Sequence, residues 1–136
     1  MNISTGSAIQ NIGTERLLGI LKGSGKNYNL EKILRAYAYA NSMHEGQFRD
    51  SGEAYISHPL AVAEIVAGLE LDTDSICAAL LHDTVEDCSD KTNLGEIEKL
   101  FGATVAMLVD GLTKIIQVQV ADKEEAHIEN IRKMLL

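Results

Sequence analysis

The sequence has few basic and few aromatic residues, and both shortages argue against a nucleic-acid-binding protein. Its 12 Lys and Arg residues stand against 20 Asp and Glu residues, which gives a formal net charge of −8 at pH 7. Contacts to a phosphate backbone need a basic footprint, so we expect no nucleic acid among the partners. With two Phe, four Tyr and no Trp, the chain also lacks the mixed aromatic and basic pattern that holds single strands. A small phosphorylated substrate stays open, because a bound cation can invert the local field.

Cysteine is also scarce, and long hydrophobic runs are missing. The two cysteines, Cys77 and Cys88, are too few for a disulfide framework. Cys77 lies in an apolar segment and is expected in the core, whereas the acids beside Cys88 should raise its pKa and keep the thiol unreactive. No run approaches the roughly 20 apolar residues that span a bilayer, and the N-terminus has no signal pattern. We therefore expect a soluble, cytoplasmic protein with no membrane partner.

Hydrophobic residues recur at helical spacing along most of the chain, and no set of strands could form a sheet. The sequence therefore predicts an all-α fold. Its 136 residues, 46% of them hydrophobic, suffice for one domain with a single core. The predicted helices cover about residues 14–22, 30–43, 59–69, 74–87, 94–101, 105–113 and 123–136. Residues 116–120 alternate in polarity, which allows a short strand, although a mobile connector is preferred.

Capping residues mark where several of these helices begin. The expected N-caps are Thr14, Asn29, Asn93 and either Asp72 or Thr73, and the expected C-terminal glycine is Gly102. Pro59, the only proline, suits the first helical position and would make His58 an N-cap-like residue with its imidazole on a fixed backbone. The helix that follows is apolar nearly all round, so we expect it at the centre of the fold.

The stretch Ala78-Ala-Leu-Leu-His-Asp-Thr-Val-Glu-Asp87 ends an apolar helix with four groups that can bind a metal or move a proton. Helical spacing would place His82 beside Glu86, and Asp83 beside Asp87. His82 and Asp83, which are neighbours in the chain, could bind a cation. Glu86 and Asp87 would then act on water one turn further on. The alternative is a solvated helix end. We prefer the site, because acids at a helix C-terminus oppose the macrodipole and charge beside buried residues needs a partner.

His58 supplies a third candidate ligand. It begins one apolar helix and His82 ends the next, so crossing helices could bring both imidazoles and Asp83 to one point. By itself, His58 would more often be a capping or core histidine. A mixed set of imidazole and carboxylate ligands suits Mn, Fe or Zn better than Ca.

Four segments carry a family resemblance that covers about residues 30–130. They are His44-Glu-Gly-Gln-Phe-Arg49, Ser51-Gly-Glu-Ala-Tyr-Ile-Ser-His-Pro59, the stretch from Ala78 to Asp87, and Phe101-Gly with Val109-Asp-Gly-Leu-Thr-Lys114. Together they resemble the HD-type hydrolase domain of the RelA/SpoT alarmone enzymes. The resemblance implies an all-α, HD-domain helical bundle that binds Mn²⁺. It also implies hydrolysis of the 3′-diphosphate of ppGpp or pppGpp, which yields GDP or GTP and pyrophosphate and degrades the stringent-response alarmone.

The resemblance also implies a role for individual residues. The matched metal ligands are His58, His82 and Asp83. The matched pair that handles the attacking water is Glu86 and Asp87. Arg49 matches the residue that packs on the guanine base, since a guanidinium stacks on planar rings, and Ser51 and Tyr55 are expected to line the same pocket. His44 is expected to be a structural hydrogen-bonding residue, and Lys114 a surface lysine.

The sequence departs from the family pattern at several points. Asp50 stands where the family often has Lys, Ala54 where it has Pro, and Cys88 where it has Thr. The family's fourth metal ligand is an Asp in a later helix, which neither His127 nor Glu129 matches. We therefore expect residues 1–136 to be a single HD-type hydrolase domain that is C-terminally incomplete, with weakened metal binding.

Two rival hypotheses follow from these departures. Asp50 motivates an HD phosphohydrolase that acts on another nucleotide. The unmatched ligand motivates a catalytically silent domain that binds a nucleotide or a partner. The apolar end at Met134-Leu-Leu136 could dock on a second copy, so a homo-oligomer is a further expectation.

Overall fold

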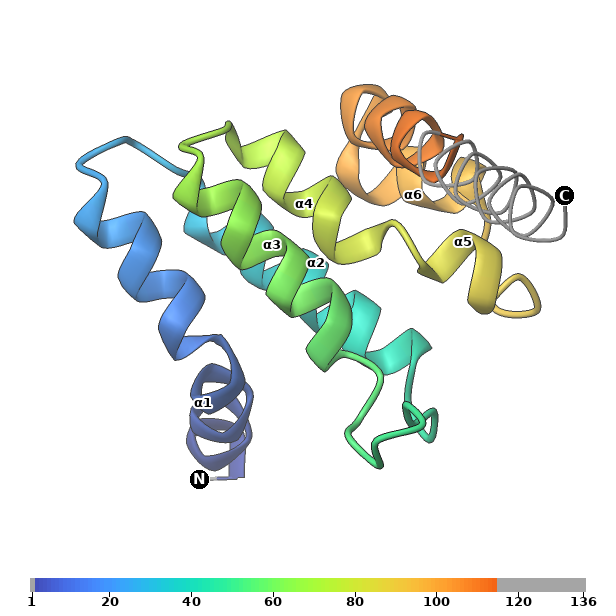
Figure 1. The fold of residues 1–136 in the computed structure, drawn as a ribbon, viewed down its shortest axis with the longest axis horizontal. Coiled ribbons are helices and arrows are strands. Elements are labelled where there is room, and N and C mark those ends of the chain that lie inside the picture. The colour runs from blue at the N-terminus through green and yellow to red at the C-terminus, as the bar shows by residue number, and fades with distance from the viewer. Residues whose placement is uncertain (1, 115–136) are drawn as a thin grey trace, which may run out of the picture.

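The computed structural model describes residues 2–114, with side chains from residue 13 onward. Six helices are followed by a further helical segment at residues 103–114 (Figure 1). The helices are α1 (Asn2–Gly23), α2 (Leu30–Met43), α3 (Ser57–Gly68), α4 (Thr73–Leu81), α5 (Thr84–Asp87) and α6 (Leu94–Phe101). Within this part of the chain the only strand-like pairing is an isolated bridge between Phe48 and Ala54. The all-α prediction is confirmed. No described helix has both the length and the apolar character to cross a membrane.

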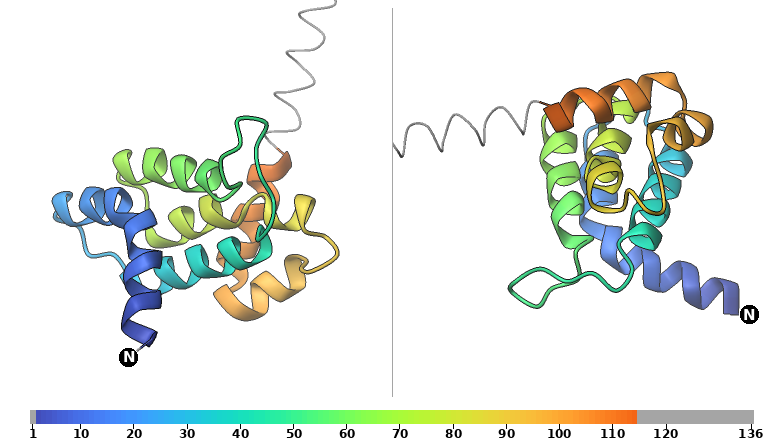
Figure 2. Two further views of the ribbon diagram at one scale, coloured as in Figure 1. Left: turned by 90° about the horizontal axis from the view of Figure 1, so that it is seen from below. Right: turned by 90° about the vertical axis from the view of Figure 1, so that its right-hand side faces the viewer.

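α4 is the central helix of the bundle. It packs against α2 and α3, and every residue from Ile76 to Leu81 is buried. When the structure is seen from the end, α4 lies between α2, α3 and the segment 103–114 (Figure 2, right). Cys77 is among its fully buried residues, which confirms its predicted place in the core. The chain immediately after α4 is therefore anchored to the best-protected part of the fold.

The expectation that the helix after Pro59 lies at the centre is wrong. α3 packs one side against the bundle, while Ile65 on the other side is 65% exposed. The side chains on the packed side are the buried Pro59, Ala63 and Ala67 and the half-buried Leu60, Val62 and Val66. An apolar composition does not reveal which sides of a helix find a partner, and exposed aliphatic side chains are ordinary on protein surfaces. α3 is thus a peripheral helix that packs one side against the bundle and exposes the other to solvent.

Three of the predicted N-caps are present. The side chains of Asn29, Asp72 and Asn93 accept hydrogen bonds from backbone N–H groups three residues later, at 3.1, 2.9 and 2.9 Å. Gly102 ends α6 with a φ of 102°, as predicted for a glycine at this position. Thr14 is a correction. It lies inside α1 rather than at its start, because this helix begins at Asn2, and its side chain is fully buried.

The helix predicted for residues 74–87 is interrupted at His82 and Asp83. Here side chains bond to carbonyl groups that an unbroken helix would offer to its own backbone. His82 Nδ1 donates to the Ala79 carbonyl at 2.6 Å, and the Thr84 hydroxyl donates to the Leu81 carbonyl at 2.7 Å. Such local bonds compete with the helical ladder. α5 then resumes with a bond from the Asp87 N–H to the Asp83 carbonyl at 2.8 Å.

The predictions that fall on residues 115–136 lie outside the described residues. They concern the connector or strand at 116–120 and the helix at 123–136, together with His127, Glu129 and Met134.

Truncation of a buried leucine in α4 should destabilise the fold far more than the same change on its surface. Leu80→Ala removes a fully buried side chain and should lower the free energy of unfolding by about 2–5 kcal/mol. Leu69→Ala, at a position that is 67% exposed, should change it by about 0.5 kcal/mol or less. Urea denaturation of both variants measures the difference, and equal losses would contradict the central place of α4.

The Asp72 cap should make stability depend on pH. Its hydrogen bonds with Ser75 lower the pKa of Asp72 below the ordinary value. A carboxyl whose pKa is lower in the folded state stabilises the fold fully above its unfolded pKa, and this stabilisation is lost as the pH falls through the folded value. The destabilisation caused by Asp72→Ala should therefore shrink at low pH. Asp72→Asn keeps a capping oxygen that does not titrate, so its advantage over Asp72→Ala should stay constant in urea denaturation at each pH.

Candidate metal centre

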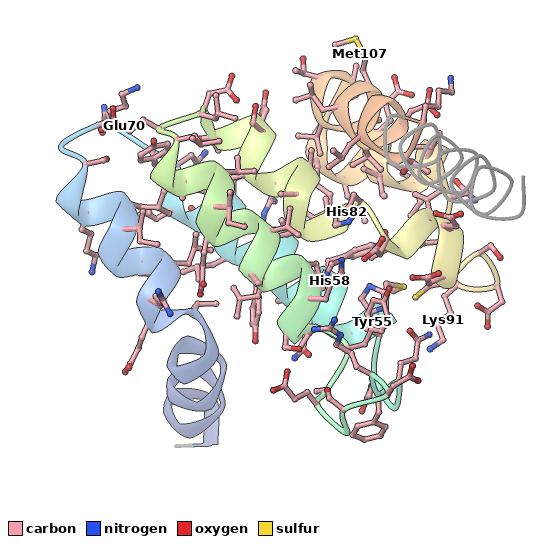
Figure 3. The ribbon with its side chains drawn as sticks, in the orientation of Figure 1. Tyr55, His58, Glu70, His82, Lys91 and Met107 are labelled. Atoms are coloured by element: carbon pink, nitrogen blue, oxygen red, sulfur yellow. The ribbon has the colours of Figure 1, made fainter. Side chains whose placement is uncertain are left out.

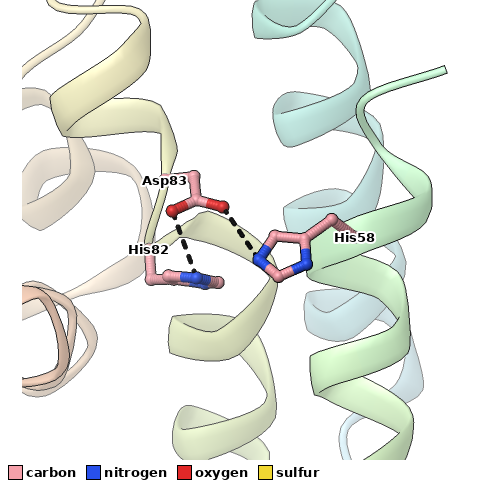
Figure 4. A group of neighbouring side chains, drawn as sticks. All are labelled: His58, His82 and Asp83. Carbon is pink, nitrogen blue, oxygen red and sulfur yellow. Dashed lines mark ion pairs between the residues drawn. The ribbon is translucent and has the colours of Figure 1, made fainter. Parts of the chain in front are cut away.

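The three predicted ligands meet between α3 and the junction of α4 with α5 (Figure 4). Asp83 lies between the two imidazoles: its Oδ1 is 3.2 Å from His82 Nε2, and its Oδ2 is 3.6 Å from His58 Nε2. One ligand atom from each residue lies within 4.8 Å of the others. His58 reaches this point from the first turn of α3, which begins at Ser57, so the expectation that it is N-cap-like is wrong by two residues.

The hydrogen bond on the far side of the His82 ring fixes the tautomer of the ring. A carbonyl can only accept, so Nδ1 carries the proton that is donated to Ala79. In a neutral ring, Nε2 then presents a lone pair to a carboxylate oxygen 3.2 Å away. Two acceptors face each other inside a site where His82 is only 2% exposed. A cation that bound between the two groups would accept a lone pair from each of them.

The donor set fits a divalent cation. A metal with ligands at about 2.0–2.2 Å holds adjacent ligand atoms about 3 Å or more apart, and the two contacts of Asp83 are of this size. A carbonyl that orients a metal-binding histidine through its other nitrogen is the usual outer-shell arrangement. Imidazole and carboxylate ligands together favour Mn, Fe or Zn over Ca.

Tyr55 lies close to His58 (Figure 3) and joins this cluster to the acidic pair on α5. Its hydroxyl lies 2.7 Å from Asp87 Oδ2 and 3.3 Å from Asp83 Oδ2. Burial, followed by the hydrogen bond to Asp87, raises the pKa of Tyr55 well above its ordinary value. The predicted proximity of Asp83 and Asp87 is thus confirmed, since both reach the same hydroxyl. Glu86, the other member of the pair, is exposed beside Asp87.

The predicted substrate-binding residues come together in the loop before α3. Arg49, Ser51 and Tyr55 line a cavity of about 330 Å³ with Phe48 and Asp50. The Arg49 N–H donates to the Glu53 carbonyl at 2.8 Å, and Gly52 turns the loop with a φ of 92°. Because Tyr55 also touches Asp83 and Asp87, it links this cavity to the candidate metal ligands.

A cluster behind Tyr55 was not foreseen. His44, which is 3% exposed, stacks on the Tyr55 ring with centroids 4.6 Å apart. Its Nδ1 lies 3.0 Å from Gln47 Oε1 and 3.5 Å from Cys88 Sγ. The prediction that His44 is a structural hydrogen-bonding residue is confirmed. The His-x-x-Gln spacing at a helix end could have suggested the bond to Gln47, but nothing local pointed to the stack on Tyr55.

Cys88 is buried in this cluster. The pKa of its thiol is raised, as expected, but burial is the main cause and the nearby Asp87 and Asp90 add to it. A raised pKa keeps the sulfur as a thiol, which is the unreactive form.

Comparison with known proteins identifies the family. Residues 36–136 match the family described as HD domain. The chain belongs to the HD-domain family. Membership implies a divalent metal, and the side chains of His58, His82 and Asp83 offer a donor set for one.

The relatives of this HD domain include enzymes that are several times longer than this chain. It is 48% identical to the guanosine-3′,5′-bis(diphosphate) 3′-pyrophosphohydrolase of Vibrio cholerae and 46% identical to the bifunctional (p)ppGpp synthase/hydrolase SpoT of Escherichia coli K12, each over 79% of this chain and 15% of the relative. It is 45% identical to a GTP pyrophosphokinase of Myxococcus xanthus, over 79% of this chain and 14% of that protein. The motif-based resemblance to the RelA/SpoT hydrolase region is confirmed. The chain spans about 15% of the length of these curated relatives.

Loss of one imidazole should weaken binding of a divalent cation without unfolding the protein. His58→Ala changes a side chain that is 40% exposed, so the fold should survive. Affinity for Mn²⁺ should fall at least about tenfold, since even outer-shell partners carry effects of that size. Glu70→Gln, at the opposite end of the bundle (Figure 3), should leave the affinity unchanged. Isothermal titration calorimetry measures both, and equal affinities for His58→Ala and wild type would exclude His58 as a ligand.

Proposed function

We propose that this HD domain is a Mn²⁺-dependent hydrolase that removes the 3′-diphosphate of ppGpp or pppGpp and releases pyrophosphate with GDP or GTP. The observation that carries the proposal is the meeting of His58, His82 and Asp83 within ligand distance of one another, next to a cavity that Tyr55 shares. Relatives whose names state this reaction are 46–48% identical to the chain.

The metal supplies two things when bound: a water of lowered pKa and stabilisation of the charge that develops on the phosphoryl group. His58, His82 and Asp83 would hold it. The bond from His82 to the Ala79 carbonyl keeps the Nε2 lone pair on the side of Asp83, where it could serve as a ligand atom. Of the cations that suit imidazole and carboxylate donors, Mn²⁺ is the one we propose, on the strength of the family resemblance.

Asp87 and Glu86 act as the proton acceptors for the attacking water. Both are exposed on α5, the helix that begins directly after the ligand Asp83, so water and substrate can reach them. One oxygen of Asp87, Oδ2, already accepts the Tyr55 hydroxyl hydrogen, which leaves Oδ1 to take a proton. The two neighbouring carboxylates titrate as a pair, and we assign the function to the pair.

The loop cavity holds the guanine nucleotide. Arg49 is exposed at its rim, where a guanidinium can stack on a planar base and donate to it. Ser51 offers a hydroxyl to the same cavity. Lys114 pairs with Asp110 at 2.9 Å on an exposed helix face, which supports the expectation that it is a surface lysine.

A second candidate function is hydrolysis of another nucleotide. Asp50 lines the same cavity as Arg49 and Tyr55, and a carboxylate there repels phosphate and accepts from amino groups of a base. A panel of nucleotides assayed for phosphate and pyrophosphate release separates the two candidates. A kcat/KM that is higher for another nucleotide than for ppGpp would favour the second.

The protein should release pyrophosphate from ppGpp in the presence of Mn²⁺. Asp87→Asn should lower kcat about 100-fold or more, because a positioned general base contributes that much. Asp90→Asn removes the same charge from an exposed turn three residues further along and should leave kcat unchanged. Absence of turnover by the wild-type protein, or an equal loss in both variants, would refute the proposal.

A further inference from the structure

Tyr55 stands apart from the other residues that line the loop cavity, because its hydroxyl turns away from the loop residues and contacts α5 and its N-cap residue. The hydroxyl has one hydrogen and two carboxylate neighbours, Asp87 Oδ2 at 2.7 Å and Asp83 Oδ2 at 3.3 Å. Neither carboxylate can donate to it. Both oxygens can therefore accept the one hydrogen: Asp87 Oδ2 is its main acceptor and Asp83 Oδ2 is a longer, weaker one. The hydroxyl thus bridges two like charges that would otherwise repel each other.

Asp87 needs such a partner to hold one orientation. It is exposed at the end of a four-residue helix, where an unpaired carboxylate samples several rotamers. Asp83 is held differently, between the imidazoles of His58 and His82 at 3.6 and 3.2 Å. The hydroxyl of Tyr55 thus sets the position of Asp87 relative to a side chain that the bundle already fixes.

The Tyr55 ring is itself held on two sides. His44, buried under the loop, stacks on it with centroids 4.6 Å apart and planes inclined by 29°. His58 meets it edge-on at 6.3 Å. The backbone N–H of Tyr55 donates to the Gln47 carbonyl at 3.0 Å, and the Gln47 side chain bonds His44. The ring is therefore placed by the C-terminal end of α2 and the first turn of α3 together.

We propose that Tyr55 is a positioning residue that orients the Asp87 carboxylate beside the metal ligand Asp83, and that the stacked His44 ring holds Tyr55 in place. This inference rests on the proposed function. It goes beyond the expectation that Tyr55 lines the nucleotide pocket, and it gives a role to His44, which contacts Tyr55, Gln47 and Cys88.

Tyr55→Phe tests the proposal, because it removes the hydroxyl and keeps the ring on His44. We expect kcat for ppGpp to fall about tenfold or more, with KM changed less than about threefold. Mn²⁺ affinity should weaken about tenfold, the lower end of outer-shell effects, since Asp83 loses the longer of the two contacts of the hydroxyl. The matched control is Tyr39→Phe. It removes a hydroxyl that lies outside the site and is 2.6 Å from the Thr92 hydroxyl, so it should leave kcat and Mn²⁺ affinity unchanged.

The two readouts separate failure of the inference from failure of the proposed function. A raised KM at constant kcat, or an unchanged kcat and Mn²⁺ affinity, would overturn the inference and leave the hydrolase function standing. A wild-type protein that binds Mn²⁺ but does not hydrolyse ppGpp would refute the function, and the difference in Mn²⁺ affinity between the two Tyr→Phe variants would still decide the inference. A wild-type protein that binds no Mn²⁺ would overturn both.

His44 gives an independent test of the second half of the proposal. His44→Ala removes the stacked ring and should lower kcat as Tyr55→Phe does, whereas His44→Phe keeps a ring against Tyr55 and should restore most of the activity. Circular dichroism and thermal unfolding of both variants identify any loss that comes from unfolding. If folded His44→Ala keeps wild-type kcat, or if folded His44→Phe does not recover activity relative to it, the stack has no positioning role.

Discussion

The site depends on the hydrogen bond from His82 Nδ1 to the Ala79 carbonyl, 2.6 Å long and buried. It uses the nitrogen that does not face Asp83 and so leaves Nε2 for the cluster. With the Thr84 hydroxyl bond to Leu81, it also replaces part of the helical ladder and separates α4 from α5. One local arrangement therefore does two things: it fixes the tautomer of His82, and it ends the central helix where Asp83 can face His58.

The parts of the fold that were predictable depend on short-range chemistry. The caps Asn29, Asp72 and Asn93 each bond to the backbone three residues later, so they can be recognised within a few residues of sequence. The same holds for Gly102, whose φ of 102° few other residues tolerate. Helical periodicity located α2 and α6, because each has an apolar face of the ordinary kind.

The rest depends on which surfaces find partners. α3 is as apolar as α4, yet α3 packs only one side against the bundle whereas α4 is enclosed on all sides from Ile76 to Leu81. The helical periodicity of a sequence does not show which apolar faces will pack against other helices. For the candidate site, the chain order suggested that His58 could meet His82 and Asp83. The contact of Tyr55 with Asp87 joins residues 32 positions apart, and the stack of His44 on Tyr55 depends on how the loop closes, so neither has a local pattern.

The enclosure of α4 has a consequence for the dynamics of the site. Amide groups in the most enclosed helix of a domain exchange with solvent chiefly through global opening, whereas surface loops open at much lower free energy. His82 and Asp83 directly follow that helix. Arg49 and Ser51, by contrast, lie on an exposed hairpin closed by one isolated bridge. The two proposed ligands at the end of α4 should therefore keep their places for as long as the domain stays folded, whereas the loop that would receive a base can open and close many times in that period.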